Sequence, residues 1–217
     1  MMIELWTDGS CSQNPGPGGW GFVVAVDGKV TQEGSGGSRA TTNNRMELTA
    51  VLEGLRTLQR PTALTVVTDS SYIEQAFNKN WIASWKKRGW KRAGKNGKPE
   101  ELKNADLWKA IDQEVNRHNK VRWRRVLGHS GIELNERADV LAVDACLEAG
   151  GDPDKMVELG GESWGNGSTM QLPLFAVTEE MVEVALDAYW GEIRSHRTEV
   201  DRKRMRRALK AAVGSVY

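Results

Sequence analysis

The stretch Leu64-Thr65-Val66-Val67-Thr68-Asp69-Ser70-Ser71 decides the predicted fold of this chain. Its first five residues form a short apolar, β-branched run that is typical of a buried strand, and Ser70 or Ser71 can cap a following helix. The segment before it has apolar residues at helical spacing until Pro61, namely Met46, Ala50, Leu52, Leu55 and Leu58. A strand that follows a helix in this way completes a β–α–β unit, so the two strands it joins should be parallel.

Three strands are predicted ahead of that helix, at residues 3–7, 20–26 and 29–34. The first reaches Asp8, where we expect it to end, and a Gly- and Pro-rich turn at 14–19 follows. Asp27-Gly28 joins the other two and is a strong hairpin signal. The first third of the chain therefore reads as an antiparallel meander that leads into the β–α–β unit.

Further elements are predicted downstream: helix 105–116, strand 121–126 and helix 135–149. Together these segments indicate an α/β fold with a mixed five-stranded sheet flanked by helices. We divide the chain into a domain at 1–150, a linker at 151–177 and a helical tail at 178–217. Thr178 and the acidic residues after it are typical of a helix start.

The composition excludes several classes of protein. The chain has 217 residues, 39% of them hydrophobic, with 30 Lys and Arg against 29 Asp and Glu. This excludes disorder throughout, and no apolar run approaches the roughly 18 residues that span a bilayer. We expect no membrane association, no signal segment and a cytoplasmic location. Two cysteines, Cys11 and Cys146, are too few for a disulfide framework and are expected to be reduced.

Four carboxylates are predicted to meet at one end of the sheet. Asp8 and Asp69 would follow neighbouring parallel strands, where ligands of α/β sheets gather. Glu47 and Asp139 each lie about one turn into a helix. Such acids repel one another unless cations are present, and oxygen-only ligation suits Mg²⁺ or Mn²⁺. Two such ions stabilise the entering and departing oxygens of a phosphodiester displacement. Singly, each acid could instead be a turn or solvated helix residue.

Six separated motifs resemble those of bacterial type 1 ribonuclease H, in order and with the family's spacing over about residues 2–149. They are Thr7-Asp8-Gly9-Ser10-Cys11, Asn14 to Gly19, Thr42 to Leu48, Thr68-Asp69-Ser70, Trp81 with Trp85 to Trp90, and Gly128-His129 through Asn135 to Asp139. The resemblance implies Mg²⁺-dependent hydrolysis of the RNA strand of an RNA/DNA hybrid, leaving 5′-phosphate and 3′-hydroxyl ends.

The resemblance also implies catalytic roles. Asp8, Glu47 and Asp69 would hold the first Mg²⁺, and Asp8 with Asp139 the second, with Mn²⁺ as a substitute. His129 resembles the mobile loop residue that assists proton transfer or product release, a task suited to an imidazole pKa near 6.5. The alternative for His129 is a loop histidine bonded only to backbone.

By the same resemblance, four polar residues would contact the hybrid. Asn14 and Asn44 would contact the strands in the minor groove, and Thr42 and Asn43 would help seat a DNA phosphate. Asn14 could also serve as a turn residue and Thr42 as a helix cap. Ser71 departs from the family, many of whose members have a substrate-contacting glutamine there.

The basic segment 79–98 is the second region that we predict to contact the substrate. It holds eight Lys and Arg with no acidic residue. Cations attract a polyanion and aromatic faces stack on sugars or bases, so we predict contacts from Trp81, Trp85, Lys86, Lys87, Arg88 and Trp90. In the family this segment is a basic protrusion that grips the DNA strand. The alternative is that the tryptophans anchor a solvated face to the core.

Gln171-Leu172-Pro173-Leu174-Phe175 is an apolar island after a Gly- and Ser-rich linker. It is similar to the peptide by which bacterial replication proteins dock onto the DNA sliding clamp. Gln171, Leu172, Leu174 and Phe175 would make that contact. The peptide could equally fold back on the first domain.

Two other functions compete with hybrid cleavage. One is a different nuclease of this fold, such as a resolvase or transposase, against which the Trp- and Lys-rich segment and the Asn14 loop argue. The other is a hybrid-binding module without catalysis, against which the retention of all four acids argues.

Overall fold

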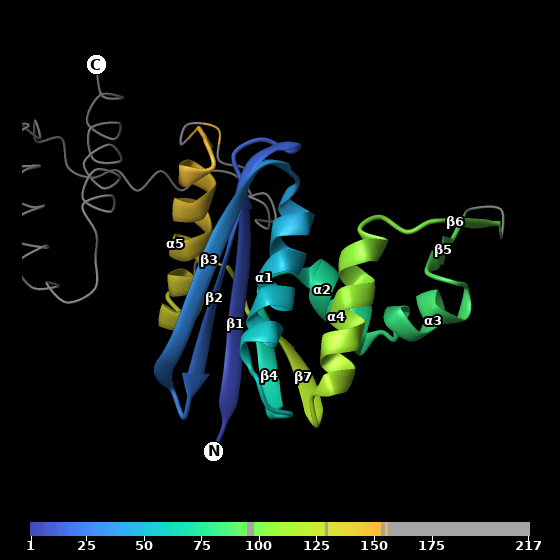
Figure 1. Cartoon of the computed structure of the whole chain (residues 1–217), viewed down its shortest axis with the longest axis horizontal. Helices are drawn as coiled ribbons and strands as arrows, with labels where there is room; N and C mark the ends of the chain where they lie inside the picture. The colour runs from blue at the N-terminus through green and yellow to red at the C-terminus, as the bar shows by residue number, and fades with distance from the viewer. Residues whose placement is uncertain (95–97, 129, 153–154, 156–217) are drawn as a thin grey trace, which may run out of the picture. The chain divides into compact units, whose positions relative to one another are not determined.

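The computed structural model describes residues 1–94, 98–128, 130–152 and 155. A five-stranded sheet has the strand order β3-β2-β1-β4-β7. The strands are β1 (Ile3–Cys11), β2 (Gly16–Val26), β3 (Lys29–Thr41), β4 (Ala63–Thr68) and β7 (Lys120–Arg125). β1 pairs with β2 antiparallel and with β4 parallel, which confirms the predicted mixed sheet (Figure 1).

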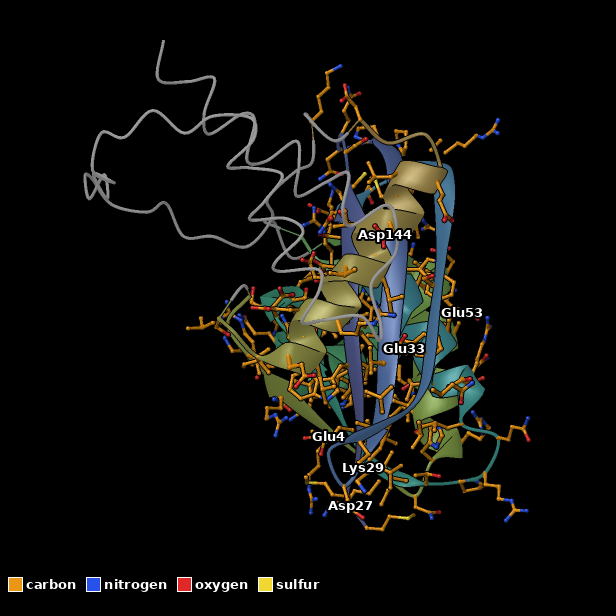
Figure 2. The ribbon with its side chains drawn as sticks, turned by 90° about the vertical axis from the view of Figure 1, so that its left-hand side faces the viewer. Glu4, Asp27, Lys29, Glu33, Glu53 and Asp144 are labelled. Carbon is orange, nitrogen blue, oxygen red and sulfur yellow. The ribbon has the colours of Figure 1, made fainter. Side chains whose placement is uncertain are left out.

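The first three strands are longer than predicted. β1 does not end at Asp8 but continues to Cys11, because Asp8 and the residues after it stay paired with β2 as far as Gly18. The expected turn at 14–19 is wrong from Gly16 onward, since β2 begins there. The tip of the β2–β3 hairpin lies at Asp27 and Gly28 as predicted, with positive φ at both. Figure 2 labels Asp27 at this tip.

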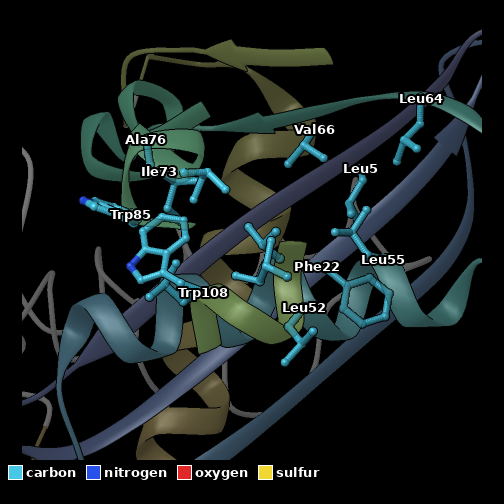
Figure 3. Packing of buried hydrophobic residues seen from close by; sticks show 14 of the residues in the cluster. Leu5, Phe22, Leu52, Leu55, Leu64, Val66, Ile73, Ala76, Trp85 and Trp108 are labelled. Atoms are coloured by element: carbon cyan, nitrogen blue, oxygen red, sulfur yellow. The ribbon is translucent and has the colours of Figure 1, made fainter. Parts of the chain in front are cut away.

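Helices cover both faces of the sheet. The apolar cluster on one face combines strand residues with residues of α1 (Asn43–Thr57), α2 (Ser71–Asn78) and α4 (Ala105–Arg117). Trp108 of α4 is fully buried in it, and Leu5 and Val66 reach it from the strands (Figure 3). Burying such side chains stabilises the domain by roughly 1.5–3 kcal/mol each. This core packs against the central strands β1 and β4 and fixes their positions.

The opposite face is covered by α5 (Glu133–Glu148). A Cβ at Gly21 of β2 would lie 2.5 Å from the Ala138 carbonyl oxygen, so the helix rests directly on strand backbone. Glu33 of β3, labelled in Figure 2, accepts two hydrogen bonds from Arg137 at 2.9 and 2.7 Å. This close packing determines where Asp139 lies.

The basic segment forms α3 (Trp81–Lys87) and β5 (Lys91–Ala93), and β5 pairs in an unpredicted hairpin with β6 (Pro99–Glu101), which follows the segment. The sequence segment has no acid of its own, yet the fold supplies three, so the expectation of uncompensated charge is partly wrong. The ion pairs are Lys86 with Asp112, Arg92 with Glu100 and Lys91 with Glu101. Exposed pairs of this kind contribute about 0–1 kcal/mol each.

Cys11 and Cys146 are both buried, and neither forms a disulfide within the described ranges, in line with the expected reduced thiols. None of the helices within the described ranges is long and apolar enough to serve as a membrane span. His129, the Gln171–Phe175 peptide and the predicted tail at 178–217 lie outside the described residues. The sliding clamp as a partner therefore stays a prediction.

Gly21→Ala should destabilise the domain by about 1–3 kcal/mol, because the added methyl overlaps the α5 backbone. Urea unfolding measures the change. The control is Ser35→Ala, at the exposed β3 position paired with Gly21, which should change stability by no more than about 0.5 kcal/mol. Equal stabilities of the two variants would contradict the direct helix–strand contact.

Candidate active site

The parallel pairing of β1 with β4 brings two of the predicted acids together. Its last register pair is Trp6 with Val67. Asp8 and Asp69 each lie two residues beyond this pair, Asp8 within β1 and Asp69 directly after the end of β4. The prediction that they share one edge of the parallel pair is therefore met, although β1 itself continues past Asp8.

Glu47 reaches the same place through a contact between backbones. A Cβ at Gly9 would lie 2.2 Å from the main-chain nitrogen of Glu47, so α1 can approach β1 this closely only because residue 9 has no side chain. The next residue after Asp8 thus positions the helix that carries Glu47. Asp139 lies nearly two turns into α5, further from the helix start than predicted, because the helix begins at Glu133.

The charges that act on Asp8 place the other three acids near it. Burial raises the pKa of Asp8 well above its ordinary value. Three negative charges raise this pKa further, those of Asp69, Asp139 and Glu47. The Gly9 N–H donates to Asp8 Oδ1 at 2.7 Å, which acts in the opposite direction. Asp8 is therefore the centre of a repelling cluster.

Glu47 is the most buried of the four acids, with 8% of its surface exposed. Burial raises its pKa to about 7, and the charge of Asp69 adds to the shift. The Ser70 hydroxyl donates to Oε2 at 2.5 Å and the Asn43 amide donates to Oε1 at 2.9 Å, and both bonds favour the charged form. These bonds orient both oxygens of Glu47 while leaving lone pairs for another ligand.

Ser70 was missed as a site residue by the sequence reasoning, which considered it only as a helix cap. It is the N-cap of α2, but it makes no side-chain capping bond, because its hydroxyl is directed at Glu47. The available signal was its place directly after Asp69. Asn43 was predicted to seat a DNA phosphate, yet its side chain is buried and bonded to Glu47, four residues along the same helix.

The donor set fits a hard divalent cation, since it consists of carboxylate oxygens that repel one another without one. Within the described ranges, no three His, Cys, Asp or Glu side chains lie close enough to ligate a single ion as they stand. The repulsion between the charges of the four acids acts over longer distances than a metal coordination bond does.

The loop after β7 closes the site beside Asp69. A Cβ at Gly128 would lie 2.7 Å from Asp69 Oδ2, so the chain passes directly over this carboxylate. The loop is held by the Ser130 hydroxyl, which donates to the Leu127 carbonyl at 2.6 Å, and by Gly131 N–H, which donates to Glu136 at 2.9 Å. His129 belongs to this loop, and its proposed role stays a prediction.

The predicted minor-groove residues gather near the same end of the sheet. The pairing of Gly16 with Thr41 brings the Asn14 loop beside the start of α1. Asn14 and Asn44 are exposed, whereas Thr42 is half-buried as the N-cap of α1, without a side-chain capping bond. Both asparagines are therefore available to a ligand that lies across the carboxylates.

The tryptophans predicted to contact the substrate differ in their exposure. Trp85 is 7% exposed and packs against Trp108 with ring centroids 5.3 Å apart, which is the core-anchor alternative. Trp81 and Trp90 are half-buried, and Lys86, Lys87 and Arg88 are exposed. Stacking on a ligand is thus open to Trp81 and Trp90, while Trp85 packs against Trp81 with ring centroids 6.1 Å apart.

The stability of the metal-free chain should fall as pH rises from about 5 to 8. The folded state holds a proton on Glu47 up to about pH 7, whereas an unfolded glutamate releases it near 4.5. The resulting stability is complete below the unfolded pKa and is lost as pH rises through the folded one, on the order of 1–3 kcal/mol. Urea unfolding in a chelator at both pH values measures this loss.

Glu47→Gln should flatten that pH dependence, whereas Glu53→Gln on the same helix should not. The comparison cancels other titrating groups, such as His118, whose pKa is lowered by burial. An unchanged slope in Glu47→Gln would contradict the raised pKa.

Comparisons with known proteins agree with this geometry. The RNase H family model matches residues 2–147. Ribonuclease H of Bordetella pertussis (strain Tohama I) is 53% identical over 142 residues, spanning 65% of this chain and 87% of that protein. Ribonuclease H of Pseudomonas fluorescens (strain Pf0-1) is 55% identical over 140 residues, spanning 64% of this chain and 87% of that protein.

Solved structures have the same fold. LC9-RNase H1, described as a type 1 RNase H with the type 2 active-site motif, gives a TM-score of 0.58 at 34% identity, over 76% of this chain and 81% of that one. LC11-RNase H1, solved in complex with an RNA/DNA hybrid, gives 0.52 at 24% identity over 68% and 98%, which is a likeness of fold alone. The family match extends over most of the described domain and includes all four acids, so this chain belongs to the ribonuclease H family.

Proposed function

We propose that this protein is an endoribonuclease that hydrolyses the RNA strand of RNA/DNA hybrids and leaves 5′-phosphate and 3′-hydroxyl ends. The observation that carries the proposal is the convergence of Asp8, Glu47, Asp69 and Asp139 at one edge of the sheet. Membership of the ribonuclease H family supports the same chemistry. A cluster of buried, mutually repelling acids lowers stability and is retained where it binds cations.

Two divalent cations, Mg²⁺ or Mn²⁺, would be held by these carboxylates: Asp8, Glu47 and Asp69 for one and Asp8 with Asp139 for the other. When bound, such ions generate a nucleophile from water near neutral pH and stabilise the leaving oxygen. The chain's own contribution is to orient the donors. Ser70 and Asn43 hold both oxygens of Glu47, and Gly9 keeps α1 close to β1.

Selection of a hybrid would depend on the polar residues around the Gly16–Thr41 pair. An A-form-like hybrid exposes its 2′-hydroxyls in a wide, shallow minor groove. Asn14 and Asn44, both exposed at this end of the sheet, would contact sugars or base edges there. The protrusion with Trp81, Trp90, Lys87 and Arg88 would contact the DNA strand through phosphates and sugars.

Purified protein with Mg²⁺ should cleave only the RNA strand of a labelled RNA/DNA hybrid, and not double-stranded DNA or double-stranded RNA. End analysis of the products should show 5′-phosphates. A chelator should abolish cleavage. Cleavage of DNA would instead favour the resolvase or transposase alternative, and binding without cleavage would favour a non-catalytic module.

Asp8→Asn should reduce cleavage by more than about 100-fold, because it removes the acid shared by both proposed cation sites. The same change relieves the repulsion at the centre of the cluster, so it should raise the stability of the metal-free chain by about 1–2 kcal/mol. Loss of activity together with increased stability excludes unfolding as the cause. A fully active Asp8→Asn variant would refute the proposed site.

A further inference from the structure

Arg125 is a cation held at the rim of the carboxylate cluster. It is the last residue of β7 and pairs in register with Thr68 of β4, the residue that precedes Asp69. Its Nε donates to the main-chain carbonyl oxygen of Asp69 at 3.1 Å. This bond fixes the base of an otherwise exposed guanidinium next to one of the proposed cation ligands.

The rest of the Arg125 guanidinium is unused within the described part of the chain. It makes no ion pair there, and neither Nη has a hydrogen-bond partner. The adjacent Arg124 is different, because it donates to Glu4 at 2.8 Å and lies 5.3 Å from the centroid of the Trp6 ring. Arg124 is thus held by structural contacts, whereas Arg125 presents free donors at the site.

A phosphate is the ligand that best matches these donors. Guanidinium groups bind phosphate oxygens through two parallel hydrogen bonds, and they stay charged at any working pH. The carboxylates beside Arg125 repel a polyanion, so a fixed cation at their edge offsets that repulsion for a phosphate near the cleaved bond. The phosphates on either side of the cleaved bond belong to the same strand and lie close to it, whereas the backbone of the other strand lies across a groove. A phosphate bound by Arg125 beside the carboxylates therefore belongs to the cleaved strand.

We infer that Arg125 binds a phosphate of the RNA strand within one or two nucleotides of the cleaved bond, an assignment that rests on the proposed hybrid cleavage. No motif carried over by the family resemblance includes this residue. This contact increases the affinity for the substrate and fixes the position of the RNA strand in the site. Arg125 itself does not contact the reacting atoms.

Arg125→Gln and Arg122→Gln form a matched pair of variants. Arg122 lies on the same strand, is exposed, and points to the other face of the sheet because it is three positions away. Both changes remove one positive charge. Steady-state cleavage of an RNA/DNA hybrid in Mg²⁺, over a series of salt concentrations, compares them with the unchanged chain.

Arg125→Gln should raise KM about 3- to 10-fold, leave kcat within about twofold, and reduce the slope of log KM against log salt by about 1. Arg122→Gln should change none of these by more than about twofold. Arg125→Lys should recover part of the loss in KM. If Arg125→Gln instead matches Arg122→Gln, or shifts only the pH profile of kcat, Arg125 merely neutralises the carboxylates and the inference is overturned.

Hybrids with one uncharged methylphosphonate linkage, beside a 2′-O-methyl sugar for chemical stability, locate the phosphate. Binding is measured in the Asp8→Asn background so that the RNA stays intact. One RNA-strand linkage near the cleavage position should weaken binding when Arg125 is present and have no effect after Arg125→Gln. Additive losses at every RNA linkage, or coupling only to a DNA-strand linkage, would overturn the assignment.

The two proposals fail in distinguishable ways. If the unchanged chain does not cleave the hybrid in Mg²⁺, the proposed function fails and the Arg125 assignment fails with it. If the unchanged chain cleaves the hybrid while Arg125→Gln behaves as Arg122→Gln does, only the Arg125 assignment fails.

Discussion

Mutual repulsion among the carboxylates around Asp8 is the constraint on which the architecture of this domain depends. Burial and three neighbouring charges all oppose ionisation of that one side chain. Left to themselves the acids would separate, so the fold has to hold them by contacts elsewhere. Those contacts are the parallel pairing of β1 with β4, the apolar layer beneath the sheet, and the rigid attachment of two helices.

The attachment of the helices shows how closely backbone packing and chemistry are linked. Gly9 allows α1 to touch β1, and Gly21 allows α5 to touch β2. A methyl group at either glycine would move an acid-bearing helix away from the strand and thus separate the carboxylates. Small residues on the strands therefore set the positions of Glu47 and Asp139 as directly as the acids' own places in the sequence do.

Two polar residues near the site donate side-chain hydrogen bonds to an acid instead of capping the helices that they begin. Ser70 begins α2 without capping it, and Asn43 begins α1 with its side chain turned inward. Each gives Glu47 one hydrogen bond. The helices are stable without these caps because their apolar faces are buried in the core. Arg125 differs from them, since it donates to the main-chain carbonyl oxygen of Asp69 and leaves its remaining donors exposed.

The sequence by itself determined the order of the main elements, the parallel pair and the identity of the four acids, because apolar periodicity and strand topology are local or nearly local properties. It placed the end of β1 too early, since pairing with β2 is a tertiary contact that extends the strand past Asp8. Only the tertiary structure brought Asp112, Glu100 and Glu101 to the basic segment and buried Trp85 against Trp108. Asp112 and Trp108 lie far along the chain from their partners, and Glu100 and Glu101 reach theirs only because a hairpin folds back, so periodicity along the sequence does not reveal these contacts.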